Sequence, residues 1–142
     1  MNNSGFTIIE LICIVAILGI IITLTIPNMK FSYGIKLYAV QLCSDIRHVR
    51  VKKMTEGKDY KIYIDDNFYE IRKGIKTIKR VDLPKDIKII SNYRKKYINF
   101  TYRGAPVVSG SINIFDEKQN RYFQITIVPA SGRILLKDEI FE

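Results

Sequence analysis

Glu10 is the residue whose type and position predict chemistry most clearly. It is the one charged residue among the 21 residues from Phe6 to Ile26. A carboxylate within so apolar a segment is costly in lipid and usually marks a functional site. If the bond between Gly5 and Phe6 is cut, the new amine lies one helical turn before Glu10. The spacing predicts an ion pair, formed within one chain or with the amine of a neighbouring chain.

Other residues that are able to support catalysis have simpler explanations. His48, the single histidine, is expected on a helix as a solvent-facing or packing residue. Asp65 and Asp66 resemble a carboxylate pair, but a hairpin turn uses the same residue types for backbone hydrogen bonds. The sequence has neither Cys/His spacing typical of metal sites nor a phosphate-binding glycine loop. We therefore expect no enzyme, no cofactor and no metal.

The segment that positions Glu10 is long and apolar. As a helix, residues 6–26 extend about 30 Å, which is enough to cross a bilayer. A secretory signal peptide should start with basic residues and have a shorter apolar run. A simple anchor gives Glu10 no role, and a buried helix of a soluble protein rarely has so long an apolar run. We expect residues 6–29 to cross the membrane once.

The sequence Gly-Phe-Thr-Ile-Ile-Glu-Leu, which begins at Gly5, resembles the start of type IV pilins and pseudopilins, the class III signal peptide family. The resemblance implies cleavage after Gly5 by a prepilin peptidase and methylation of the new amine on Phe6. It also implies that Glu10 neutralises the N-terminus of a neighbouring subunit during assembly. The resemblance further implies that the helix loosens in the filament between Gly19 and Pro27, and both residue types are known to weaken helices. A membrane anchor with a chance glutamate is the alternative.

The resemblance also implies partners and a location. The precursor would lie in the cell membrane as a single-pass protein with its head outside the cytoplasm. Its partners would be other pilin or pseudopilin subunits, prepilin peptidase, the inner-membrane assembly platform and membrane lipid. Charge alone predicts the opposite orientation, because the leader lacks Lys and Arg whereas the sequence after the span is basic. The expected orientation therefore rests on the resemblance.

The helix is expected to continue to about Glu56 as an amphipathic helix, with Gly57 as its C-terminal cap. Apolar residues recur every three or four positions, as on one face of a helix. The predicted buried stripe is Phe31, Ile35, Tyr38, Leu42, Ile46 and Val49. The predicted solvated face contains Lys36, Gln41, Asp45, Arg47 and Arg50.

The two cysteines, Cys13 and Cys43, are not expected to form a disulfide. On one helix they would lie about 45 Å apart, whereas a disulfide needs Cα atoms within about 7 Å. Both are expected to be small buried apolar residues.

After Gly57 the apolar spacing changes to two residues, which indicates strands. We expect strands at 60–64, 68–72, 75–81, 87–90, 97–102, around 112–114, 122–128 and 133–136. Seven or eight such strands predict an α+β fold, in which a long N-terminal helix packs on an antiparallel sheet or β-sandwich head. The expected domains are a cleaved leader (1–5), a transmembrane and filament-core helix (6–29), an amphipathic helix (30–56) and a β-rich head (57–142).

The C-terminal part of the chain resembles the GspH/FimT group of minor pilins. The residues that carry this resemblance are Ile98, Asn99, Phe100, Arg103, Gly104, Gly110, Ser131, Gly132 and Arg133. It implies a low-abundance subunit of a type IV pilus or a type II secretion pseudopilus. Such subunits are thought to help start assembly and to lie near the tip.

The head is strongly basic, which raises DNA binding as an alternative function. From Lys30 onward the chain holds all 23 Lys and Arg but 13 of the 14 acidic residues, a net charge of +10. Such a surface attracts polyanions, although scattered lysines mainly confer solubility. Some FimT-like proteins bind DNA through Gly-Arg-x-Arg, but Leu135 replaces the second Arg here. The candidate contacts are Arg94, Lys95 and Lys96 between Tyr93 and Tyr97, with Arg103, Arg121 and Arg133.

Overall fold

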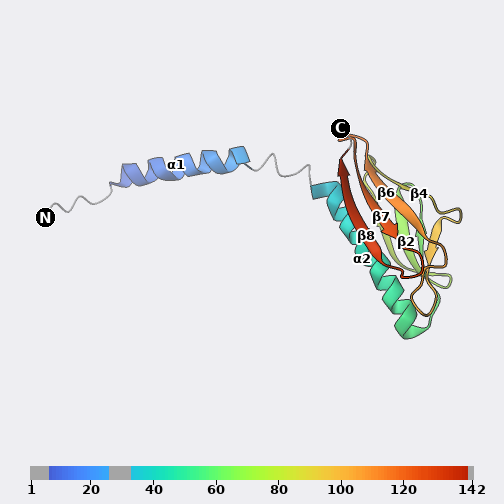
Figure 1. The fold of residues 1–142 in the computed structure, drawn as a ribbon. Coiled ribbons are helices and arrows are strands. Elements are labelled where there is room, and N and C mark those ends of the chain that lie inside the picture. Colours follow the sequence, from blue (N-terminus) through green and yellow to red (C-terminus); the bar gives the residue numbers. More distant parts are fainter. Residues whose placement is uncertain (1–6, 26–32, 141–142) are drawn as a thin grey trace. The chain divides into compact units, whose positions relative to one another are not determined.

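The computed structural model describes residues 7–25 and 33–140 (Figure 1). The chain divides into two compact units, Met1–Gly34 and Ile35–Glu142. The helices are α1 (Ile8–Thr25) and α2 (Tyr33–Glu56). The strands are β1 (Tyr60–Ile64), β2 (Phe68–Lys73), β3 (Lys76–Asp82), β4 (Ile87–Ser91), β5 (Tyr97–Asn99), β6 (Gly110–Asp116), β7 (Arg121–Ile127) and β8 (Ile134–Ile140). The expected weak point at Pro27 lies outside the described residues.

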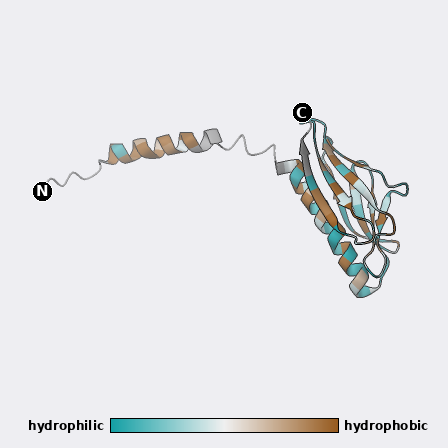
Figure 2. Cartoon of the chain, viewed as in Figure 1, coloured by the Kyte–Doolittle hydropathy of each residue, from teal (hydrophilic) through white to brown (hydrophobic). Residues whose placement is uncertain are grey.

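The first unit contains α1, whose residues are mostly apolar (Figure 2). Every side chain from Thr7 to Ile21 is exposed in the single chain. Cys13 is among them, so the expectation that it is buried was wrong for the isolated chain. Within residues 7–25 and 33–140, no helix has both the length and the hydropathy of a candidate membrane span.

Helix α2 presents its predicted apolar stripe to the core of the second unit. Ile35, Leu42, Ile46 and Val49 are at most 1% exposed. Tyr38 is partly buried at the edge of the stripe, and Phe31 lies outside the described residues. The helix ends as expected at Gly57, whose φ is +62° and whose N–H donates to the Lys53 carbonyl oxygen.

The predicted polar face of α2 is at least partly exposed throughout, and three of its side chains also make contacts that the sequence did not predict. Asp45 accepts hydrogen bonds from the Tyr69 hydroxyl, at 2.7 Å, and from the Lys79 ammonium. Arg47 and Arg50 donate to backbone carbonyls of distant segments. None of the five residues predicted for this face is buried, but helical periodicity does not show which of these polar side chains find partners.

The strands form two four-stranded antiparallel sheets, ordered β3-β2-β1-β5 and β4-β6-β7-β8. The inward side chains alternate along the strands, and they join the stripe of α2 in one apolar core. The α+β prediction is therefore confirmed. The strand expected at 97–102 was too long: β5 ends at Asn99 because Phe100 pairs with Pro106 and the Thr101 N–H donates to the Ala105 oxygen.

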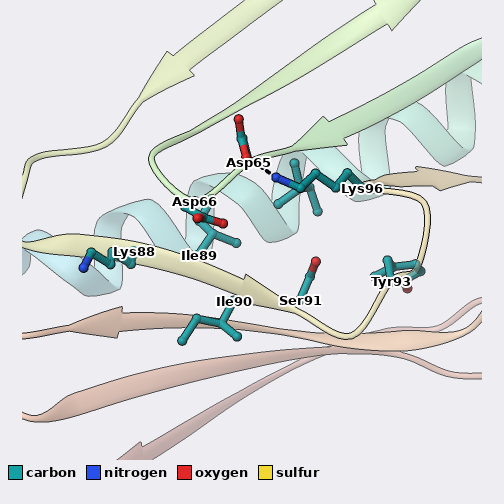
Figure 3. Close-up of a pocket in the computed structure, with 9 residues that line it drawn as sticks. Asp65, Asp66, Lys88, Ile89, Ile90, Ser91, Tyr93 and Lys96 are labelled. Carbon is teal, nitrogen blue, oxygen red and sulfur yellow. Dashed lines mark hydrogen bonds and ion pairs between the residues drawn. The ribbon is translucent and has the colours of Figure 1, made fainter.

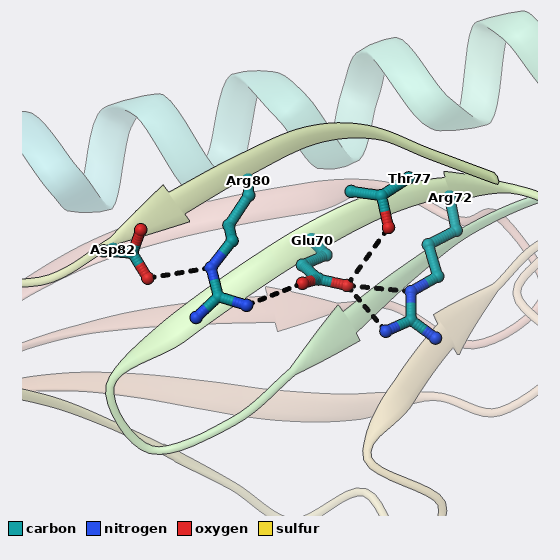
Figure 4. A network of polar contacts seen from close by, with 5 residues as sticks. All are labelled: Glu70, Arg72, Thr77, Arg80 and Asp82. Carbon is teal, nitrogen blue, oxygen red and sulfur yellow. Dashed lines mark hydrogen bonds and ion pairs between the residues drawn. The ribbon is translucent and has the colours of Figure 1, made fainter.

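The outer face of the first sheet carries a nearly buried carboxylate, Glu70, which is 6% exposed (Figure 4). Arg72 donates from Nε at 2.8 Å to one carboxylate oxygen, and Arg80 donates from Nη1 at 2.9 Å to the other. The Arg72 hydrogen bond is the main reason that the pKa of Glu70 lies below its usual value. The same guanidinium groups lie over aromatic rings, Arg80 over Phe68 and Arg72 over Tyr63. Cross-strand polar and aromatic contacts therefore stabilise this face.

Candidate functional site

Glu10 lies in the first turn of α1, and its side chain is exposed. The carbonyl oxygen of Thr7 accepts from the N–H groups of Glu10 and Leu11, at 3.1 and 3.2 Å, so the helix begins directly before the glutamate. The helix dipole favours a negative charge at this end. Gly19 also lies on α1, where a Cβ would have no neighbour within 4 Å. Gly5, Phe6 and Pro27 lie outside the described residues.

Two loops of the head meet at Arg50 of α2. The Nε of Arg50 donates to the Gly104 oxygen at 2.8 Å, and its Nη2 donates to the Ser131 oxygen at 2.9 Å. A Cβ at Gly132 would overlap the Gly104 oxygen, so the two backbones touch. Both glycines have positive φ, +80° and +63°, which other residues rarely adopt. Arg50 therefore connects the loop after β5 to the loop before β8. We call this contact of Arg50 with Gly104, Ser131 and Gly132 the Arg50 junction.

The structure divides the candidate DNA-contacting residues into two groups. Arg103 and Arg133 are exposed, and each adjoins a glycine of the Arg50 junction. Arg94 and Lys95 are also exposed, but they precede β5 whereas Arg103 follows it. The two groups thus lie at opposite ends of that strand. Arg121 is only partly exposed, and its Nε is buried.

Two residues of the expected basic cluster have surroundings that the sequence did not show. Lys96 is exposed and forms an ion pair with Asp65, with 2.7 Å between Nζ and Oδ1. Tyr93 is 7% exposed, so its ring is not available to stack on a base. Tyr97 is partly exposed and packs against Tyr63, with 5.6 Å between the ring centroids. The partners of these residues lie far away in sequence, and the local spacing carried no sign of them.

Asp65 and Asp66 lie in the turn between β1 and β2, beside a pocket of about 250 Å³ (Figure 3). The backbone N–H of Asp65 donates to the carbonyl oxygen of Phe68, which closes the turn. The backbone carbonyl oxygen of Asp66 accepts from the N–H of Ile89 in β4. The hydrogen bond from Lys96 lowers the pKa of Asp65. Asp65 is thus held as a carboxylate, in the turn role that the sequence predicted.

His48 is exposed on α2, where it borders a pocket together with Asp45 and Lys79. Across residues 7–25 and 33–140, no three or more His, Cys, Asp or Glu side chains form a group that could hold a metal ion.

A second pocket, of about 350 Å³, lies beside β5, and our reading of the sequence missed it. Tyr97 and Asn99 of the strand line it, together with Arg94 and Lys95 before the strand. Val107 and Val108 line it from the segment before β6, and each is 56% exposed. Two adjacent valines after a proline were the available signal, but no periodicity links them to the basic residues.

Comparison with known proteins agrees with this architecture. Residues 1–26 match the family model of the prokaryotic N-terminal methylation motif. The minor pseudopilin EpsH from the type 2 secretion system of Vibrio cholerae has a similar fold, with a TM-score of 0.62 and 12% identity, covering 74% of this chain and 97% of EpsH. The type IV minor pilin FimU of Pseudomonas aeruginosa also has a similar fold in two crystal forms, with TM-scores of 0.61 and 0.60 and 15% identity in both. The match covers 72% of this chain in each case, and 87% and 91% of the FimU chain in the two forms. No curated protein sequence matches significantly. Motif and fold both fit the type IV pilin family.

The glycines that carried the minor pilin resemblance have packing roles in this pilin-like fold. Of the seven described glycines, only Gly104, Gly110 and Gly132 would bring a Cβ into contact with neighbouring atoms. At Gly104 the Cβ would lie 2.5 Å from Met54 Sδ, and at Gly110 it would meet Asn92 and the ring of Tyr93. The resemblance thus picked out positions where segments distant in sequence approach closely.

Proposed function

We propose that this chain is a minor pilin or pseudopilin, a structural subunit of a type IV pilus or a type II secretion-like pseudopilus. The observation that carries the proposal is the combination of an N-terminal methylation motif with a head that has the fold of minor pilins. Its activity is assembly rather than turnover of a substrate. The chain is expected to act in initiation of the filament or at its tip, as the resemblance to the GspH/FimT group implies.

The mechanism follows from the residues of α1. The apolar segment holds the precursor in the membrane lipid, with the head outside the cytoplasm. Prepilin peptidase cuts after Gly5 and methylates the amine of Phe6. The inner-membrane platform then moves the subunit into the filament, where the exposed carboxylate of Glu10 pairs with the amine of a neighbouring subunit. The exposed apolar side chains of α1 are covered by the helices of other subunits.

The intact mass of the membrane-extracted chain tests this proposal. We would express the full chain with an active prepilin peptidase and, as the matched control, with an inactivated one. With the active enzyme we expect a chain that begins at Phe6 and is heavier by one methyl group. With the inactive enzyme we expect the uncut chain. An uncut chain in both samples would contradict the proposal and leave a basic β domain with an N-terminal apolar helix.

DNA binding by the head is a second candidate role. The observation that favours it is the position of Arg103 and Arg133, both exposed and both next to the Arg50 junction. Two exposed cations, each next to one of two glycines whose backbones touch, on a chain with a net charge of +9 would attract phosphates. The pairing of Lys96 with Asp65 and the burial of Tyr93 weaken the contribution of the 94–96 segment to this role.

A further inference from the structure

The pocket of about 350 Å³ beside β5 is bounded by two segments of the chain. Residues 105–107 run along the edge of β5 that faces away from β1. Pro106 pairs with Phe100, and the N–H of Val107 donates to the carbonyl oxygen of Asn99 at 2.9 Å. Small-molecule sites have volumes of about 300–1,000 Å³. The pocket is therefore closed to a further strand, but its size suits a small ligand.

The apolar part of the lining comes from three side chains. Val107 and Val108 are adjacent, and each is 56% exposed. Tyr97 of β5 packs against Tyr63 of β1 and also lines the pocket. A ligand that covers this surface would remove apolar groups from water, which is favourable.

Arg94 and Lys95 give the pocket a positive charge. Both side chains line it and are exposed, and neither forms an ion pair in the described part of the chain. The next residue, Lys96, differs because it pairs with Asp65 at 2.7 Å. None of the described residues that line the pocket is acidic. These charges favour a ligand with an anionic group.

Two asparagine side chains add hydrogen-bond donors to the lining. The Oδ1 of Asn92 accepts from the N–H of Ser111 at 2.9 Å. The Oδ1 of Asn99 accepts from the buried ammonium of Lys53 at 2.8 Å. Because each amide oxygen is turned to a partner within the head, the NH2 groups are what these amides can offer to a ligand. The charged and amide side chains of the lining therefore all offer donors.

We propose that this pocket binds a small aliphatic anion, a short hydrocarbon chain that ends in a carboxylate or a phosphate. The chain of the ligand lies against Val107, Val108 and the ring of Tyr97. Its anionic end pairs with Arg94 and Lys95. A carboxylate or phosphate anion offers mainly acceptors to these donors, whereas the amides and hydroxyls of a base or a sugar would also oppose donor to donor. This binding goes beyond the proposed assembly role and does not depend on it.

Nuclear magnetic resonance of hexanoate tests the proposal on the full chain in maltoside micelles. The carbon-13 signal of a labelled carboxyl group is followed as protein is added, and micelles without protein correct for partition into detergent. We expect a saturable change for hexanoate and none for labelled acetate, which lacks the chain. Hexyl phosphate should displace hexanoate, and the concentration that it needs shows which head group is preferred. Hexan-1-amine, which has the same chain with a positive charge, should not displace it.

A double variant and its control assign the charge preference to the pocket. Arg94→Glu with Lys95→Glu should weaken hexanoate binding by about tenfold or more, because charge-assisted contacts are lost and like charges are opposed. Lys76→Glu with Lys85→Glu makes the same change of net charge at exposed lysines that do not line the pocket. This control should bind hexanoate as the wild type does.

Val108→Ser tests the apolar wall. The loss of apolar surface should weaken hexanoate binding by about threefold or more. Val51→Ser is the control, since Val51 is 55% exposed but lies on α2, outside the pocket. All the substituted side chains are exposed, so each variant should keep the melting temperature of the wild type, which circular dichroism checks.

Three results would each overturn the proposal. One is the absence of a saturable hexanoate signal at low ionic strength. A second is binding of acetate as tight as that of hexanoate, or equal weakening by the Lys76 and Lys85 control, which would reduce the pocket to a positively charged surface. A third is displacement by hexan-1-amine as strong as by hexyl phosphate, which would leave an apolar surface with no preference for charge. None of these results concerns cleavage after Gly5, so failure here is distinguishable from failure of the proposed function.

Discussion

At the residue scale, the sequence shows which positions carry charged side chains but not which of these side chains form ion pairs. Glu10 stands out because an ionisable group in a long apolar run has few structural uses. Lys96 looked like one of three equivalent cations, yet it alone of the three forms a described ion pair, with Asp65, which lies 31 positions earlier. Cys43 is buried as predicted, whereas Cys13 is exposed in the single chain. Residue type fixes what a side chain can do, and its environment depends on contacts between segments that are distant in sequence.

Glu10→Gln is expected to leave cleavage after Gly5 intact and to reduce incorporation into filaments. The change keeps the size of the side chain but removes the charge that, in the proposed function, pairs with the amine of the neighbouring subunit. Hydrogen bonds to charged groups contribute about 1.5–3 kcal/mol, so the loss should be about tenfold or more. Incorporation is measured by immunoblotting of sheared filaments against the membrane pool. Glu10→Asp, which keeps the carboxylate, should incorporate better than Glu10→Gln, and unchanged incorporation of the glutamine variant would refute the pairing role.

At the element scale, periodicity predicted α2 and most strands, because burial on one face imposes spacings of 3.6 or 2 residues. Ile46 at the centre of the helix stripe and Ile112 in β6 are both fully buried, as expected. The prediction was wrong where a contact across the fold overrides local pattern. Phe100 alternates correctly with Ile98, yet its pairing with Pro106 ends the strand. The Arg50 junction was also missed, since its partners lie 54 and 81 residues away.

Gly132→Ala tests the close approach of the two loops. The variant must adopt a φ of +63° and place its Cβ against the Gly104 oxygen. Strain and overpacking together should lower the free energy of unfolding by about 2–5 kcal/mol. The matched control is Gly74→Ala, where φ is +59° but a Cβ would have no neighbour within 4 Å. This control should lower the free energy of unfolding by about 1–2 kcal/mol. Both variants are measured by urea denaturation. Equal losses of unfolding free energy in the two variants would show that the loops tolerate a side chain at Gly132.

At the scale of the whole molecule, the sequence predicted an antiparallel sheet or sandwich but not the distribution of strands between sheets. β4 lies between β3 and β5 in the chain, yet it belongs to the second sheet whereas both neighbours belong to the first. Alternation of apolar residues is the same in either sheet, so the pattern carries no information about the partner of a strand. The pocket beside β5 depends on this topology and could not be predicted for the same reason.

Acid is expected to destabilise the head through its paired carboxylates. Lys52 and Tyr60 hydrogen-bond to Glu56 and lower its pKa to about 2, and Arg72 lowers the pKa of Glu70. Because these folded-state values lie below the unfolded values, the unfolded chain binds more protons as pH falls. The stabilisation is complete above the unfolded pKa of about 4.3 and is lost as the pH falls toward 2.

Thermal melting, followed by near-ultraviolet circular dichroism, measures this effect. The melting temperature should change little between about pH 7 and pH 5 and fall below about pH 4, since only the lower range titrates these carboxyls. Glu70→Gln should melt at a lower temperature at neutral pH but show a smaller fall in acid, because one of the titrating groups is gone. If Glu70→Gln and the wild type showed the same fall in melting temperature in acid, Glu70 would be excluded as a contributor to the acid sensitivity.

The Arg50 junction also limits how the chain can change in length. Surface loops usually accept insertions at little cost, because closing a longer loop adds little entropy loss. Here one guanidinium holds two loops whose backbones touch, so a residue added to either loop would displace the other. The turn between β2 and β3 is different, since Ile75 is fully exposed and Gly74 has open space around it. Homologous chains, and tags introduced by experiment, should therefore gain residues at the Gly74 turn and keep the length of the two loops constant.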